Sequence, residues 1–265
     1  MVIDIDGTRI QISSWQRPPG PGVPAVLWLH GAGMDRTVWT LAARDPGLRG
    51  VASLAVDLPG HGGSAGGAPS TVEDHAALVG RLLDGLGIER AVLAGHSMGG
   101  LIALAAMAAM PERLDGLVLA GAAARMPVNP ALIQAAENDL PKAARMIATY
   151  AVAPAGRRAA AATPGVRLAG SAVAMLERSR PGVLAADLRA CDQAAPATGP
   201  CPVPALVVTG ALDRMSPAKR GAELAAALGA RLARLEGAGH MMMLERPDAF
   251  AQAVLPFLAE VRAGR

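Results

Sequence analysis

Short apolar runs alternate with helix-like stretches along this chain of 265 residues. Five of the runs are almost entirely apolar and end at or just before a glycine-containing turn: 24–30, 51–58, 91–95, 117–121 and 205–210. Unbroken apolar runs of this length are typical of strands that are buried on both faces of a parallel sheet. Strands that alternate with helices predict an α/β protein, in which helices flank a mostly parallel sheet.

Turn and capping signals predict further elements at other points of the chain. Residues 2–13 predict a hairpin that turns at Asp6-Gly7, and residues 231–236 predict a last strand. The sequence Ser70-Thr71-Val72-Glu73 predicts a capping box, and therefore a helix from this point to about residue 85. Pro247 is in a favourable first position for a terminal helix.

One long stretch, residues 122–200, breaks this alternation. It consists of alanine-rich helical pieces separated by prolines and contains no clear buried strand. We therefore expect a helical cap at 122–200, inserted between two strands of an α/β core formed by 1–121 and 201–265. The stretch has 9 basic and 5 acidic residues, a net charge of +4, which is more than the +3 of the whole chain. A solvated helix surface is the ordinary interpretation of this excess, and attraction of an anionic substrate is the alternative.

Composition excludes several classes of partner and site. Aromatic residues make up 2% of the chain and no dense basic run occurs, so we expect no nucleic-acid binding. Two cysteines, Cys191 and Cys201, are too few for a disulfide framework or a cysteine-rich zinc site. The first ten residues do not resemble a signal peptide. The longest apolar stretch, near 101–110, is far shorter than the ~20 residues of a membrane-spanning helix. We expect a soluble cytoplasmic protein with no membrane partner.

The motif Gly-x-Ser-x-Gly, which surrounds the nucleophile of many hydrolases, occurs twice. The copy at 62–66 lies in a glycine-rich loop that no helix follows, whereas the copy at 95–99 lies between a buried strand and a helix. A nucleophile elbow needs such a strand-to-helix turn, with small residues two positions before and after the serine. Ser97 is therefore the candidate nucleophile, and Ser64 is expected to be an ordinary loop residue.

A serine nucleophile needs a histidine base that a third group orients. Of the five histidines, His240 lies in a loop between the last predicted strand and the terminal helix. The other four occupy less suitable places: His30 and His61 in glycine-rich turns, His75 in the capped helix, and His96 in the elbow itself.

Asp213 is the candidate for the orienting acid. It follows the strand at 205–210 by three residues, whereas the loop after 117–121 contains no acid. Capping of the next helix, near Ser216-Pro217, is the alternative role for this carboxylate. The chain order Ser97, Asp213, His240 is the order expected for hydrolases built on a sheet of this kind.

With these motifs, nearly the whole chain resembles the α/β-hydrolase superfamily. The resemblance implies an eight-stranded, mostly parallel sheet with a cap between the sixth and seventh strands. Carried over position by position, it makes Ser97 the nucleophile, Asp213 the acid and His240 the base. The motifs that carry it are HGAG at 30–33, DLPGHGGS at 57–64, GHSMGG at 95–100, GALDRMSP at 210–217 and GAGHMMMLERP at 237–247.

The resemblance also implies an oxyanion hole formed by the backbone N–H groups of Ala32 and Met98, with Gly33 as the alternative to Ala32. Because aromatic residues are few, we expect aliphatic and methionine side chains to line the substrate pocket. The candidates for this lining are Met126, Met175, Met215 and Met241, with ordinary core packing as their alternative role.

These residues predict a serine hydrolase that cleaves an ester-like bond (carboxylester, lactone or thioester) of a small apolar substrate through an acyl-enzyme. The chemistry needs no metal and no organic cofactor. We expect a monomer or homodimer. The alternatives are a small-molecule binding or receptor protein on the same fold, with little or no turnover, and an acyltransferase or carbon–carbon hydrolase. Multiple turnovers on any ester would separate the enzyme from the receptor.

Overall fold

The computed structural model describes residues 1–154, 167–196 and 198–264, and it contains an eight-stranded sheet. The strand order is β1-β2-β4-β3-β5-β6-β7-β8. Strand β2 pairs antiparallel with both neighbours, and the other pairs are parallel. The strands are β1 (Val2–Ile5), β2 (Thr8–Gln16), β3 (Ala25–Leu29), β4 (Ala52–Val56), β5 (Ala91–His96), β6 (Leu114–Ala120), β7 (Ala205–Gly210) and β8 (Arg231–Leu235).

Helices connect most of the strands and cover both faces of the sheet. The connections also contain three short 3-10 helices: η1 (Arg36–Trp39), η2 (Pro46–Leu48) and η3 (Pro111–Arg113). The α-helices are α1 (Thr40–Ala43), α2 (Val72–Gly85), α3 (Met98–Ala109), α4 (Pro130–Asn138), α5 (Leu140–Ala151), α7 (Leu168–Glu177), α8 (Val183–Gln193), α9 (Ala218–Leu228), α10 (Met242–Glu245) and α11 (Pro247–Ala263). None of these helices is long and apolar enough to cross a membrane.

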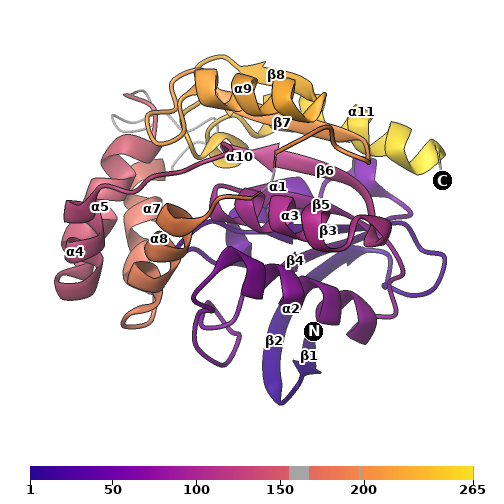
Figure 1. Ribbon diagram of the computed structural model, residues 1–265, viewed down its shortest axis with the longest axis horizontal. Coiled ribbons are helices and arrows are strands. Elements are labelled where there is room, and N and C mark those ends of the chain that lie inside the picture. Colours follow the sequence, from indigo (N-terminus) through magenta and orange to yellow (C-terminus); the bar gives the residue numbers. More distant parts are fainter. Residues whose placement is uncertain (155–166, 197, 265) are drawn as a thin grey trace.

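The strand side chains alternate between two hydrophobic clusters, one on each face of the sheet. In β3, Leu27 belongs to the cluster that also includes residues of α2, α3 and α9, whereas the next residue, Trp28, belongs to the cluster that includes residues of α1 and α11. Helices α2 and α3 cross the front of the sheet in Figure 1. Burial on both faces explains why every residue of β3 to β7 is buried and why most of them are apolar, as the apolar runs predict.

The structure confirms the predicted α/β fold, and several element boundaries differ from the sequence-based expectations. Strand β6 begins at Leu114, three residues before the predicted start, because Leu114 and Gly116 already pair with Ala91 and Val92 of β5. The apolar run did not include this extension because it contains Asp115, which is buried and pairs with Arg90 at 2.9 Å. The N-cap of α2 is Thr71, whose hydroxyl accepts the N–H of Asp74 at 3.1 Å. The capping pair is therefore shifted by one residue from the predicted Ser70 and Glu73.

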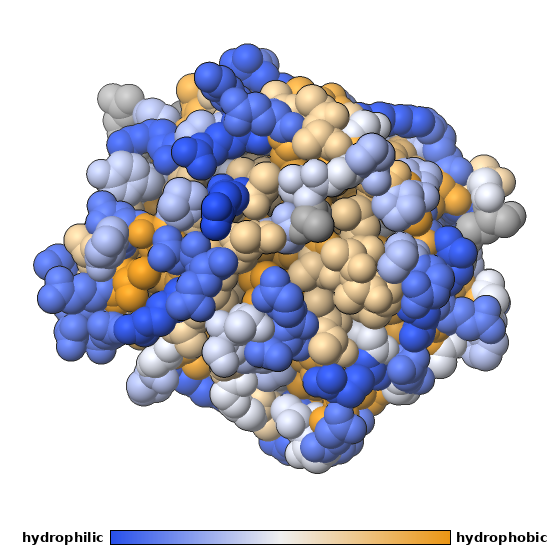
Figure 2. Space-filling view, viewed as in Figure 1, coloured by the Kyte–Doolittle hydropathy of each residue, from blue (hydrophilic) through white to orange (hydrophobic). Residues whose placement is uncertain are grey.

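The chain between β6 and β7, which we call the inserted segment (residues 121–204), contains four described helices and no described strand. Helices α4, α5, α7 and α8 gather at one end of the sheet, at the left of Figure 1. The predicted cap spans 122–200, of which 155–166 and 197 lie outside the described residues, and its status as a separate domain stays a prediction. On the face shown in Figure 2, hydrophilic residues surround a pale, weakly hydrophobic centre.

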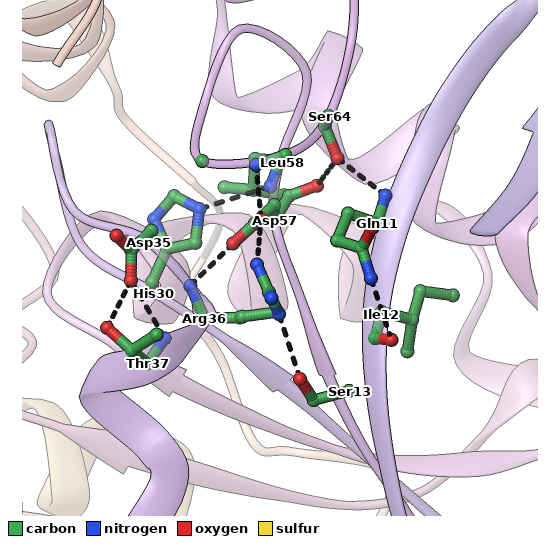
Figure 3. A network of polar contacts seen from close by, with 12 residues as sticks. Gln11, Ile12, Ser13, His30, Asp35, Arg36, Thr37, Asp57, Leu58 and Ser64 are labelled. Atoms are coloured by element: carbon green, nitrogen blue, oxygen red, sulfur yellow. Dashed lines mark hydrogen bonds and ion pairs between the residues drawn. The ribbon is translucent and has the colours of Figure 1, made fainter. Parts of the chain in front are cut away.

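The second Gly-x-Ser-x-Gly serine, Ser64, has a structural role (Figure 3). Its hydroxyl donates to the carbonyl of Asp57 at 2.6 Å and accepts the backbone N–H of Gln11 at 2.8 Å. The Asp57 carboxylate in turn binds the backbone and side chain of Arg36, at 2.7 and 2.5 Å. Ser64 is fully buried and occupied by these bonds, which agrees with its interpretation as a loop residue.

A buried ion pair joins the inserted segment to the core. Asp187 on α8 accepts from Nε2 of His61 at 2.8 Å and from the backbone N–H of Gly33 at 2.7 Å, through the same carboxylate oxygen. The other ring nitrogen of His61 donates to the carbonyl of Pro59 at 3.0 Å. Both nitrogens of His61 face oxygen acceptors, so this ring is a cation that donates two hydrogen bonds.

The electrostatic surroundings of His61 agree with this protonation state. Burial by itself lowers its pKa, but the charge and hydrogen bond of Asp187, with help from Pro59 and Asp57, outweigh burial and raise the pKa above its ordinary value of 6.5. The neighbouring ring of His30, 4.7 Å away between centroids, has a pKa of about 3, mainly because of burial and the His61 charge. The neutral His30 therefore packs beside the charged His61 without like-charge repulsion.

We predict that Asp187→Ala lowers the free energy of unfolding by about 3–5 kcal/mol at pH 6, because it leaves a buried imidazolium without its partner. The raised pKa of His61 means that the ion pair contributes fully below pH 6.5 and that its contribution is lost as His61 loses its proton at higher pH. Urea unfolding of the parent and of Asp187→Ala should therefore show a smaller loss of unfolding free energy at pH 9 than at pH 6. Glu177→Ala, at an exposed position of α7, is the control and should change little at either pH. Equal losses for Asp187→Ala at the two pH values would contradict a charged pair.

Candidate active site

The turn between β5 and α3 holds Ser97 in a strained conformation. Its φ is 53° and its ψ is −115°, a region that residues with a side chain rarely adopt. A Cβ atom at Gly95 would collide with the carbonyl of Gly99, and one at Gly99 would collide with the carbonyl of Leu29. The two glycines thus let β5, α3 and β3 meet at this point. Ser97 is fixed there by its own N–H, which donates to the carbonyl of Ala120 at 2.9 Å.

The position of this turn follows from the order of the strands. The chain passes from β3 to β4 on one side of β3 and then to β5 on its other side. In open sheets with parallel strands, ligands bind at the carboxyl ends of the strands where such a reversal occurs. The glycine-rich loop at 30–33 follows β3 and the turn at Ser97 follows β5, so both predicted motifs lie at this reversal.

Asp213 and His240 meet from the loops that follow β7 and β8. Nδ1 of His240 donates to Oδ2 of Asp213 at 2.8 Å, and both side chains are buried. Oδ1 of Asp213 accepts the N–H groups of Met215 and Ser216, each at 2.8 Å. The alternative role, capping of the next helix, is not observed, because α9 has Pro217 as its N-cap and no side-chain cap. One oxygen of Asp213 instead holds the turn before α9, and the other binds the imidazole. With its proton on Nδ1, His240 keeps the lone pair of Nε2 available as a base.

His96 supports His240 from behind. Nε2 of His96 donates to the carbonyl of His240 at 2.9 Å, and the two rings lie 4.6 Å apart between centroids. Burial, together with the nearby His240, holds the pKa of His96 well below its ordinary value. His96 is thus a neutral donor that holds the backbone of His240.

Glu245 organises the loop that carries His240. Its Oε1 accepts the N–H groups of Gly239 and Met241, at 3.0 and 3.1 Å, and its Oε2 accepts the N–H of Ala153 at 2.8 Å. Burial raises the pKa of this carboxyl, although the three hydrogen bonds oppose the shift. Because Ala153 follows α5, Glu245 ties the histidine loop to the inserted segment.

Ser97 and His240 both line a cavity of about 360 Å³ between the sheet and the inserted segment. Among the described residues, no hydrogen bond joins the hydroxyl of Ser97 to His240 in this conformation, and such contacts often tighten only when substrate is bound. The other lining residues are mostly apolar: Ala32, Met34, Met126, Pro127, Val128, Asn129, Leu132, Met146, Ile147, Tyr150, Leu188, Cys191, Arg214 and Met215.

The four methionines expected to line the pocket separate into two pairs. Met126 and Met215 are among the residues around the cavity. Met175 and Met241 are not: Met241 is buried in the hydrophobic cluster on the α1 and α11 face of the sheet, and Met175 packs against that cluster. For this second pair the alternative interpretation, ordinary core packing, describes their position. Met34 and Met146 line the cavity and were not singled out, since nothing in their local sequence marks them.

The backbone amides near Ser97 differ in whether they are already bonded. The N–H of Gly33 is bound to Asp187 at 2.7 Å. Within the described part of the chain, the N–H groups of Ala32 and Met98 have no hydrogen-bond partner. Ala32 also lines the cavity, and Met98 is the first residue of α3. Of the amides considered for an oxyanion hole, Ala32 and Met98 are therefore available, and Gly33 is not.

Sequence reasoning did not find Asp187, His96 or Glu245 as parts of this arrangement. Glu245 lies five residues after His240 in the motif at 237–247, and His96 lies beside the candidate nucleophile, so sequence position gave a signal for both. Asp187 gave none, because it is an isolated carboxylate on a helix that is 154 residues from its partner Gly33. No cluster of histidine, cysteine, aspartate or glutamate among the described residues has the arrangement of a metal site.

Comparisons with known proteins agree with this architecture. A family model described as the alpha/beta hydrolase family matches residues 26–253. Among solved structures, the chain is similar to the enol-lactonase from Burkholderia xenovorans LB400, with 26% identity, a TM-score of 0.84, and coverage of 98% of this chain and 100% of that one. It is also similar to a thermophilic esterase, with 28% identity, a TM-score of 0.81, and coverage of 98% and 97%.

A curated relative is the dihydrolipoyllysine-residue acetyltransferase component of an acetoin cleaving system from Cupriavidus necator, which is 38% identical over 117 residues. The match covers 44% of this chain and 30% of that protein, so the similarity spans less than a third of the relative's length. The family model, in contrast, covers most of this chain, and the esterase and lactonase structures share its entire fold. The chain belongs to the alpha/beta hydrolase family.

Proposed function

We propose that this hydrolase cleaves an ester-like bond (carboxylester, lactone or thioester) of a small substrate, with Ser97 as nucleophile, His240 as base and Asp213 as the orienting acid. The observation that carries the proposal is the 2.8 Å hydrogen bond between His240 and Asp213, at a cavity that Ser97 also lines. The strained turn at Ser97 adds support, because such strain is a property of nucleophile elbows.

In the proposed mechanism, Oγ of Ser97 attacks the carbonyl carbon while Nε2 of His240 takes the hydroxyl proton. The resulting imidazolium is stabilised by the carboxylate of Asp213. His240 then gives the proton to the leaving alcohol or thiol, and the acyl group remains on Ser97. A water molecule, deprotonated by His240, attacks the acyl-enzyme in the second half of the cycle and releases the acid.

A negative charge develops on the carbonyl oxygen, and we assign its stabilisation to the N–H groups of Ala32 and Met98. Both are free of protein acceptors in the described structure, and α3 begins at Met98, so the helix adds partial positive charge at this end. Each such donor can contribute on the order of 10²–10³ in rate. Because the donors are backbone groups, the side chains of Ala32 and Met98 have no direct part in this step.

The cavity supports a small, partly apolar acyl group as substrate. Its volume of about 360 Å³ lies at the lower end of ordinary ligand pockets, and most of its lining is aliphatic or methionine. The names of the similar structures, an esterase and an enol-lactonase, support the same bond class. Acyl transfer to an acceptor other than water is a second candidate, favoured by the acetyltransferase name of the curated relative.

We predict that a fluorophosphonate adds once to the parent protein and does not add to Ser97→Ala, as measured by intact mass. Turnover of 4-nitrophenyl butyrate should fall by up to about 10⁶-fold in this variant, because the triad acts as a unit. Ser64→Ala is the matched control, since it removes the serine of the other Gly-x-Ser-x-Gly motif and should keep the adduct. An adduct on Ser97→Ala, or none on a folded parent, would contradict the assignment.

We predict that Asp213→Asn lowers kcat by about 10³–10⁴-fold while the protein stays folded. The amide can still accept the N–H groups of Met215 and Ser216, but its own NH₂ then faces Nδ1 of His240. That contact places the imidazole proton on Nε2, where it prevents His240 from accepting the proton of Ser97. Steady-state kinetics on 4-nitrophenyl butyrate, with a thermal melt of each variant, provide the measurement. Asp248→Asn, at an exposed position of α11, is the control, and a rate within tenfold of the parent for Asp213→Asn would place the acid elsewhere.

A further inference from the structure

The lining of the active-site cavity carries a fixed positive charge and no acidic group. Arg214 is the only lysine or arginine among the described residues around the cavity, and no aspartate or glutamate is found there. The rest of the lining is mostly apolar, so this guanidinium is the strongest electrostatic feature that a bound molecule would meet.

Among the described residues, Arg214 has no carboxylate partner. All aspartates and glutamates of the chain lie in the described residues, and none of them forms an ion pair or hydrogen bond with Arg214. The adjacent Asp213 is already occupied by His240 and by two backbone N–H groups. No side-chain carboxylate therefore competes with an outside anion for the N–H donors of this guanidinium.

Arg214 is an exposed residue, and one contact orients its guanidinium. The central carbon lies 4.5 Å from the centroid of the Tyr150 ring, in a cation–π contact with the last turn of α5. The backbone of Arg214 is anchored, because it lies between Asp213 and Met215, which are joined by a 2.8 Å hydrogen bond. An arginine that is oriented in this way loses less conformational freedom when it binds a ligand.

The described arginines of the inserted segment do not supply this charge. Arg178 pairs with Asp35 at 3.3 Å, Arg189 pairs with Glu137, and Arg180 donates to the carbonyl of Gly62 at 3.3 Å. None of the described arginines of this segment lines the cavity. Among the described residues, the cation at the cavity therefore comes from the loop after β7.

We propose that Arg214 is a specificity-determining residue, which binds a carboxylate on the substrate while Ser97 attacks an ester-like carbonyl elsewhere in the same molecule. The substrate class is then an ester, lactone or thioester that carries a second, anionic end. This inference rests on the proposed function. It adds that the apolar middle of the substrate lies in the cavity, with its ester-like carbonyl at Ser97 and its carboxylate at Arg214. Planar bidentate binding of carboxylate is the geometry for which arginine is best suited.

Two matched esters test the proposal. The 4-nitrophenyl monoester of glutaric acid carries a terminal carboxylate, and 4-nitrophenyl 5-methylhexanoate carries a neutral isopropyl group of similar shape in its place. The parent should prefer the glutarate ester, and the ratio of the two kcat/KM values should fall by roughly 10-fold to 100-fold in Arg214→Gln, the range for a charge-assisted hydrogen bond. The loss of kcat/KM for the glutarate ester should come mainly from a higher KM, and Arg214→Lys should recover part of this loss. Arg220→Gln is the control for charge alone, because Arg220 is exposed on α9 and should leave the ratio unchanged.

A second measurement does not depend on turnover. Free glutarate should slow fluorophosphonate labelling of the parent more than that of Arg214→Gln, whereas the neutral diamide of glutaric acid should not distinguish them. An unchanged ester ratio in Arg214→Gln, an equal change in Arg220→Gln, or equal protection by glutarate in both proteins would overturn the role of Arg214. Failure of the parent to label at Ser97 would instead overturn the proposed function itself, and the inference with it.

Discussion

The close approach of three backbone segments at the carboxyl end of β5 is the constraint on which the site depends. Gly95 and Gly99 allow β5, α3 and β3 to meet at distances that a Cβ atom would forbid. The same approach places Ser97 at a positive φ and lets α3 begin immediately after it. One tight turn therefore sets the position of the serine, the direction of the helix and the distance to the loop after β3.

Buried carboxylates then fix the loops around this turn. In the described structure Asp57, Asp187, Asp213 and Glu245 each accept backbone N–H groups from a loop at this end of the sheet. Each also makes a further contact that joins two parts of the chain: Asp57 to Arg36, Asp187 to His61, Asp213 to His240 and Glu245 to the residue after α5. Loops of irregular backbone need such acceptors because their buried N–H groups have no ladder or helix partner.

Much of this architecture could be predicted because the local signals were strong. Five of the strands follow from apolar runs that end at or just before a glycine-containing turn. The turn at Asp6 and Gly7 follows from two residues that tolerate a positive φ, observed at 52° and 80°. Ser97, Asp213 and His240 could be identified from their places relative to those strands, and the structure brings Asp213 and His240 into contact. The sequence could not predict that the amide of Ala32 is available and that of Gly33 is not. This difference depends on Asp187, which binds the Gly33 amide and is remote in sequence. The methionines show the same limit, since Met126 and Met175 have similar surroundings in the sequence but different positions relative to the cavity.

The bond between Asp187 and Gly33 has a consequence for how such proteins can be recombined. Asp187 belongs to the inserted segment, but the amide that it holds belongs to the loop beside Ser97. Replacing this segment with the corresponding one from another family member would therefore exchange more than the walls of the cavity. A graft without a carboxylate at this point would free the Gly33 amide and remove the counter-ion of His61. A chimaera keeps the contact between the two parts if it preserves this acceptor, or if it exchanges the loop and the helix together.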